Sequence, residues 1–157
     1  MSINERVEQA LTRHDLDLIQ YQNGQIKDAI STINNLQIEI VAEIKRAEPS
    51  SKRELQLLLG TVDEAIDRTY AAMAMESIEA LTEYAVVESQ AVSTISSRVF
   101  RAPIAPKILP KSVALEIVET VLAPNDSSGT TIANRWLRQR DGTKGNIRDG
   151  LNYAIQN

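Results

Sequence analysis

Few residues of this 157-residue chain have the types and spacing that catalysis requires. His14 is the only histidine and there is no cysteine, which excludes histidine-based triads, multi-histidine metal sites, thiolate ligands and disulfides. His14 stands between Arg13 and Asp15, where we expect a helix surface and a solvated side chain. The sequence therefore predicts no catalytic, cofactor-binding or metal-binding residue.

Acidic side chains recur at helical spacing, a pattern typical of a solvated helix face whose carboxylates pair with Lys or Arg. They are Asp15, Asp17, Asp63, Glu64, Asp67, Glu116 and Glu119. The spacing Gly142-Thr-Lys-Gly145 has no strand before it and no Gly-Lys-Ser/Thr after it, which argues against a phosphate-binding loop. We therefore expect neither an enzyme nor a small-molecule substrate.

The elements that carry these residues are organised around Pro49, the only proline before residue 100. Proline interrupts a helix and disfavours helical backbone at the residue before it, so a first helix should span residues 2–47. Ser2 can cap its start, and Ser51-x-x-Glu54 forms a capping box for a second helix over residues 52–97. The two helices would form a long antiparallel hairpin, residues 1–97.

Apolar residues three, four or seven apart mark one face of each long helix. The stripe of the first helix skips a step near Asn23-Gly24, so that helix either continues through Gly24 or breaks there. Other apolar residues lie off the main stripes; they are Ile19, Ile38, Val41, Val86 and Val87. We therefore expect a third surface, either the C-terminal segment or another protein, to cover them.

Residues 98–111 should form an extended, proline-rich strap, because three prolines within eight residues exclude a helix. Its apolar side chains include Phe100, Ile104 and Ile108. Its basic residues, with no acid among them, are Arg98, Arg101, Lys107 and Lys111. The strap is either a linker packed on its own hairpin or a segment that docks on a partner protein or on nucleic acid.

Residues 112–157 should form a small unit of short helices. Ser112 would cap a helix over residues 113–122, and a helix carrying Trp136 would end at Asp141-Gly142 before a last helix near Ile147. Trp136 either anchors a small core or an interface, or stacks on nucleic acid. The basic residues around it are Arg135, Arg138, Arg140, Lys144 and Arg148. The predicted fold class is all-α.

Composition limits the remaining choices. The formal charge is −4 and the isoelectric point about 5.1, so no overall attraction toward nucleic acid or anionic lipid exists. No apolar run approaches the length of a membrane span, and the first residues lack the apolar core of a signal peptide. We expect a soluble, unexported chain without membrane contact, and the lack of cysteine suits a reducing cytoplasm.

The order of features from residue 110 onward carries a family resemblance. An apolar helix over 113–122 precedes a Pro/Asn/Ser/Gly loop, the segment Thr-Thr-Ile-Ala-Asn-Arg-Trp at 130–136, and Ile-Arg-Asp-Gly-Leu-Asn-Tyr-Ala-Ile at 147–155. This order resembles the phage minor head proteins of the Mu F-like head morphogenesis family. Leu11-Thr-Arg-His14 is similar to a segment near their N-termini. A longer C-terminal domain generally follows in that family, so residues 112–157 would be its start.

The resemblance implies a structural virion protein, bound to the portal protein at the portal vertex inside the capsid and assembled in the host cytoplasm. It would act in head assembly, genome packaging or ejection, with further copies, other head proteins and packaged DNA as additional partners. The hairpin and the strap would lie on the portal, with Phe100, Ile104 and Ile108 as anchors and Trp136 holding the distal helices. The family implies no catalytic residue here.

Two other classes of function stay open. A self-associating coiled-coil adaptor or scaffold would oligomerise through its own apolar stripes. A DNA-binding accessory protein would use the basic strap and the basic residues around Trp136, and its affinity would fall steeply with salt.

Overall fold

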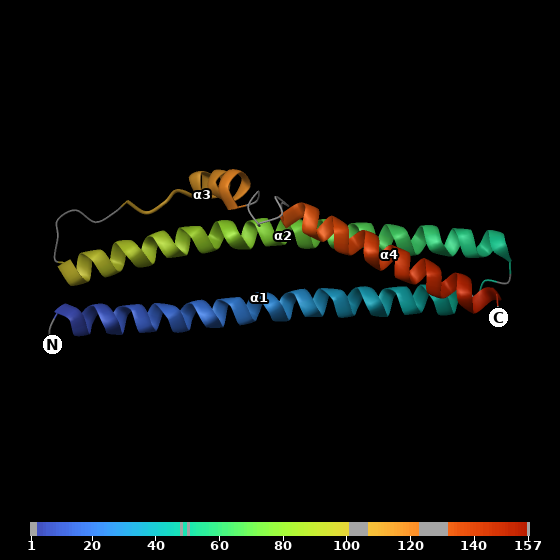
Figure 1. The fold of residues 1–157 in the computed structure, drawn as a ribbon, viewed down its shortest axis with the longest axis horizontal. Coiled ribbons are helices and arrows are strands. Elements are labelled where there is room, and N and C mark those ends of the chain that lie inside the picture. The colour runs from blue at the N-terminus through green and yellow to red at the C-terminus, as the bar shows by residue number, and fades with distance from the viewer. Residues whose placement is uncertain (1–2, 48, 50, 101–106, 123–131, 157) are drawn as a thin grey trace.

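The computed structural model describes residues 3–47, 49, 51–100, 107–122 and 132–156, and their fold is all-α (Figure 1). Two long helices, α1 (Ile3–Ala47) and α2 (Lys52–Phe100), run antiparallel as a hairpin. They are followed by α3 (Lys111–Ile117), which continues into the short π-helix η1 (Val118–Leu122), and by α4 (Ile132–Gln156). The predicted all-α hairpin with C-terminal helices is confirmed.

The turn of the hairpin forms at Pro49, as the sequence predicts. The Ser51 amide donates to the Glu54 carboxylate at 3.1 Å, and the Glu54 amide donates to the Ser51 hydroxyl at 3.2 Å. This capping box satisfies two of the N–H groups that the start of a helix leaves without partners. The other predicted cap, Ser2, lies outside the described residues.

Both long helices are continuous. α1 passes through Gly24 without a break, and a Cβ there would meet nothing within 4 Å, so no close contact requires glycine. The cost of about 1 kcal/mol relative to alanine is small beside the hydrogen bonds of a 45-residue helix. α2 extends three residues beyond its predicted end at Ser97, because no proline follows until Pro103.

The hydrophobic core lies in the half of the hairpin next to the turn. Its buried members come from α1 and α2: Leu36, Ile40, Leu58, Val62, Ala65, Ile66 and Tyr70. α4 packs Trp136, Ile147 and Leu151 against them. Leu36 and Ile40 are the only described side chains of α1 in the fully buried class, so the other half of the hairpin has a much thinner apolar interior.

The helix predicted over residues 113–122 exists, but its predicted cap is wrong. α3 begins at Lys111, its N-cap residue is Pro110, and no side chain caps it. The amides of Val113 and Ala114 donate to the Pro110 carbonyl at 3.0 and 2.9 Å. Ser112 therefore lies inside the first turn, two residues after the N-cap position.

The predicted break at Asp141-Gly142 is also wrong, because α4 is a single helix of 25 residues. Glycines at 142, 145 and 150 each weaken an isolated helix by about 1 kcal/mol. Packing on α2 offsets this cost, since Ile147 and Leu151 reach the core and Lys144 pairs with an acid of α2. Tertiary contacts outweigh local propensity here.

α2 is the central helix of the molecule. α1, α3 with η1, and α4 all pack along it (Figure 1). Ala114 and Val118 are completely buried where α3 and η1 meet α2. Both described parts of the C-terminal segment thus lie on the hairpin. None of the described helices has a stretch long and apolar enough to span a membrane.

Candidate functional site

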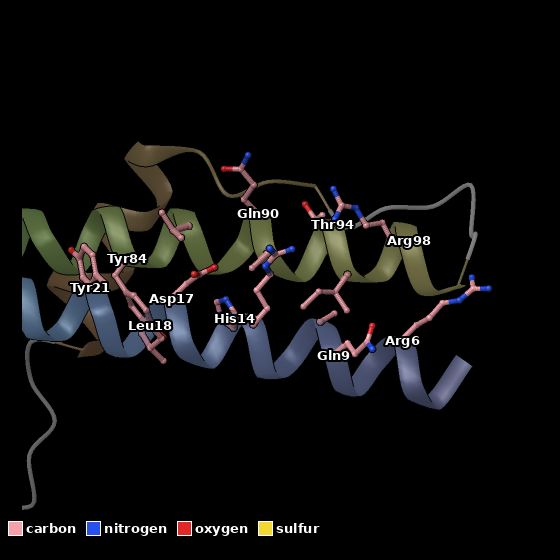
Figure 2. Close-up of a pocket in the computed structure, with 15 residues that line it drawn as sticks. Arg6, Gln9, His14, Asp17, Leu18, Tyr21, Tyr84, Gln90, Thr94 and Arg98 are labelled. Carbon is pink, nitrogen blue, oxygen red and sulfur yellow. The ribbon is translucent and has the colours of Figure 1, made fainter. Parts of the chain in front are cut away.

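A groove of about 660 Å³ lies between α1 and α2 at the end of the hairpin remote from the turn, which we call the open end. Figure 2 shows side chains from both helices lining it. Its residues on α1 are Arg6, Gln9, Ala10, Arg13, His14, Asp17, Leu18 and Tyr21. Its residues on α2 are Tyr84, Val87, Gln90, Ala91, Thr94, Ile95 and Arg98. We call this the open-end groove.

A polar network crosses from one helix to the other beside this groove. His14 Nε2 lies 2.9 Å from Glu88 Oε2, and the Tyr84 hydroxyl donates to Glu88 Oε1 at 2.5 Å. The His14 and Glu88 side chains are 20% and 31% exposed, so water screens their contact only partly. Both carboxylate oxygens of Glu88 are thus occupied, one by each helix.

Two tyrosines extend the network toward the core. The rings of Tyr21 and Tyr84 stack with centroids 6.1 Å apart, and the Tyr21 hydroxyl donates to the Ala80 carbonyl at 2.8 Å. Burial, with a smaller contribution from Glu83, raises the pKa of Tyr21. Its hydroxyl therefore stays protonated and keeps its hydrogen bond across the helix interface.

The charges in the network are fixed by its hydrogen bonds. The hydrogen bond to Glu88 raises the pKa of Tyr84 to about 12, and burial adds to the shift. The hydrogen bond from Tyr84, with a further contribution from His14, lowers the pKa of Glu88 although burial opposes it. Glu88 is therefore a carboxylate and Tyr84 a neutral phenol at neutral pH, which is the arrangement of a structural tie and not of an activated nucleophile.

The expectation that His14 is solvated is wrong. The sequence signal that could have placed it is the register of the hairpin, because a residue of α1 lies opposite the α2 residue about equally far from Pro49. That register brings His14 to Glu88 and Tyr21 to Ala80 and Tyr84. Within the described residues, no group of three or more His, Asp or Glu side chains could hold a metal ion.

The predicted basic cluster of the C-terminal segment faces acids of α2. Lys144 Nζ lies 2.7 Å from Asp67 Oδ2, Arg140 Nη1 lies 3.4 Å from Asp67 Oδ1, and Arg148 Nη2 lies 2.9 Å from Asp63 Oδ2. These three cations hold α4 on α2. Arg135 and Arg138 are exposed on α4, so the cluster that could meet nucleic acid is smaller than the sequence indicates.

Trp136 joins α4 to the middle of α2. Its indole Nε1 donates to the Ser77 hydroxyl at 3.0 Å, and its ring meets the edge of Tyr70 with centroids 6.1 Å apart. The Tyr70 hydroxyl in turn lies 2.9 Å from the Thr143 hydroxyl. Trp136 is partly buried against the chain's own core, so its contact within this chain is with α2.

The strap predicted over residues 98–111 is wrong at both ends, because residues 98–100 belong to α2 and Lys111 begins α3. Of the residues between, only 107–110 are described. The Leu109 amide donates to the Ser89 hydroxyl of α2 at 2.9 Å. Lys111 Nζ lies 3.8 Å from Oε1 of both Glu79 and Glu83. Ile108 is about half exposed beside these contacts, and Lys107 is exposed.

Other residues of the predicted strap lie outside the described residues or in the last turns of α2. Arg101 and Ile104 lie outside the described residues, and only the helical backbone of Phe100 is described. Arg98 belongs to α2 and lines the open-end groove.

No family model, curated protein or solved structure matches this chain.

Proposed function

We propose that this chain is a structural assembly protein that binds another protein through α1 and carries out no catalysis. The carrying observation is a row of exposed apolar residues on α1, which we call the isoleucine row: Ile19, Ile26, Ile30 and Ile33. Each of these side chains is between 42% and 57% exposed. Exposed apolar side chains that share one side of a helix are typical of a protein interface, and among the described helices α1 packs only on α2.

The spacing of the row supports binding to a long partner surface. Ile19, Ile26 and Ile33 are seven residues apart and therefore share one face of the helix. Ile44, five helical turns beyond Ile26, is on the same side and packs against the core. The row thus continues the apolar side of α1 past the end of the core.

Charge supports the same proposal. Residues 18–38 contain only two charged side chains, Lys27 and Asp28, while both flanks are dense in acids and bases. Interface centres are depleted of charged residues, because each buried charge without a partner costs free energy. The surrounding amides, among them Asn23, Asn34 and Gln37, can instead donate to and accept from a partner's backbone.

The partner we propose is the portal protein of a phage head. Support comes from the resemblance of residues 110–157 to the Mu F-like minor head proteins and from the rod shape of the hairpin, whose long helices suit a part buried in a large assembly. In this proposal the chain acts at the portal vertex inside the virion, in head assembly, genome packaging or ejection. The described part of the strap, with Ile108 half exposed, would add a second contact.

Co-purification with the portal protein tests the proposal. Wild type should retain the portal protein, and Ile26→Asp/Ile33→Asp should lose it. The matched control is Leu57→Asp on α2, which is 66% exposed and outside the row. The proposal is contradicted if wild type does not bind the portal protein, or if wild type, the double variant and the control bind it equally well. Phe100→Asp/Ile104→Asp tests the strap in the same assay.

The seven-residue spacing also favours a second candidate, a self-associating scaffold. Two copies of α1 could pack antiparallel about Ile26, which would place Ile19 of each copy opposite Ile33 of the other. Sedimentation velocity separates the two candidates. A concentration-dependent dimer that Ile26→Asp abolishes, without any portal binding, favours the scaffold.

A further inference from the structure

The open-end groove is elongated. It follows α1 from Arg6 to Tyr21 and α2 from Tyr84 to Arg98, which is about 22 Å at 1.5 Å per residue. Its lining includes apolar side chains from both helices: Ala10, Leu18, Val87, Ala91 and Ile95. Two of these are alanines, one on each helix, so another backbone could approach closely. The length fits about four turns of a helix better than a compact small molecule.

The rim of the groove is basic. Arg6, Arg13 and Arg98 line it, and none of the three forms an ion pair within the described part of the chain. Asp17 is the single acid among the lining residues. Glu88, beside the groove, is already bound by His14 and Tyr84. Carboxylates of an occupant could therefore pair with three guanidinium groups that have no ion-pair partner in the described part of this chain.

We propose that the open-end groove binds an acidic amphipathic helix of a partner protein. The apolar face of that helix would cover Leu18 and Ile95, and its carboxylates would pair with Arg6, Arg13 and Arg98. The chain already binds one helix by these means with the signs reversed. α4 places apolar side chains against the core while its cations pair with Asp63 and Asp67 of α2.

The arginines of this site lie away from the isoleucine row. Arg13 and Ile26 are 13 residues apart, which puts them about 140° apart around α1 at 100° per residue. Binding to the groove therefore does not rest on the portal proposal. A variant of the row, Ile26→Asp, should leave groove binding unchanged, so failure of one proposal is distinguishable from failure of the other.

Two fluorescein-labelled 16-residue peptides test the proposal by fluorescence anisotropy with the full chain. Both carry leucines at helical spacing, with glutamates on the polar face of one and lysines on that of the other. Wild type should bind the glutamate peptide at least tenfold more tightly than the lysine peptide. Arg13→Glu/Arg98→Glu should lower the affinity for the glutamate peptide at least tenfold and raise the affinity for the lysine peptide.

The matched control is Arg53→Glu/Arg138→Glu, which changes net charge equally and lies outside the groove. It should bind the glutamate peptide as wild type does, with helix content equal by circular dichroism. Ala91→Tyr, which places a large side chain in the groove without a charge change, should also weaken binding. Equal affinity for both peptides would overturn the proposal, as would an equal loss of affinity in the control variant. Dimerisation of the chain without peptide, if Arg13→Glu/Arg98→Glu abolishes it, would also overturn the proposal.

Discussion

His14 and Glu88, 74 residues apart in the sequence, meet at 2.9 Å across the open end of the hairpin. Glu88 also accepts from Tyr84 one turn earlier on α2, so a single carboxylate joins both helices. Because the apolar core lies at the other end, this contact has a larger share in holding the open end closed than it would beside the core.

Removal of this carboxylate should loosen the open end. We expect Glu88→Ala to lower the free energy of unfolding by about 1 kcal/mol, the usual scale for a partly exposed charged hydrogen bond. Hydrogen exchange of α1 around His14 should accelerate more than exchange around Leu36. Glu64→Ala, at an exposed position of α2, is the control and should change neither quantity. Equal acceleration at both places would argue against a local tie.

Alkaline pH should break the same network. The pKa of Tyr84 is raised from 10.0 to about 12 by its bond to Glu88, so the folded state holds this proton more tightly than the unfolded state. Its contribution to stability is present below pH 10 and is lost as pH rises toward 12. Absorbance at 295 nm should show a late tyrosinate step that Tyr84→Phe removes. Tyr153→Phe, on an exposed part of α4, should leave that step in place.

Asp67 should be the electrostatic anchor of α4. Asp67→Asn weakens the contacts with both Lys144 and Arg140, and we expect a loss of about 1 kcal/mol together with faster proteolysis within α4. The effect should shrink as salt is added, because Asp67 is about half exposed. Asp149→Asn, at an exposed position of α4, is the charge-matched control. A salt-independent loss would point to packing instead of charge.

The helix glycines should be sites of easy stabilisation. A Cβ at Gly24, Gly142 or Gly145 would meet no atom within 4 Å, and none of these residues has the positive φ that glycine favours. Alanine should therefore raise the free energy of unfolding by about 0.5–1 kcal/mol at each site. Thermal unfolding of the single variants and of the triple variant measures this. A destabilised Gly24→Ala would contradict this prediction.

Local rules of the sequence predicted the hairpin well. Pro49 and the Ser51-x-x-Glu54 box act within a few residues of themselves, so the end of α1 and the start of α2 could be placed without knowledge of the rest. The same rules failed at Asp141-Gly142, where packing against α2 keeps α4 continuous. Ser112 failed as a cap because the carbonyl of Pro110 already accepts the first helical bonds.

The candidate site was harder to predict because it depends on register between distant segments. Nothing local marks His14 as a partner of Glu88, and the two become neighbours only when both helices run unbroken from the turn. The prediction of a basic patch on α4 was wrong for a related reason. The spacing of the basic residues indicated a patch, but the acids that pair with them, Asp63 and Asp67, lie on another helix.

The position of the core next to the turn has a consequence for the order of folding. Contacts such as Ile40 with the first turns of α2 close short loops, while the pairing of His14 with Glu88 closes a loop of more than 70 residues. The hairpin should therefore zip from Pro49 outward, and its last-formed turns should open first. Fraying of a few turns would then separate the two walls of the open-end groove while the core stays intact.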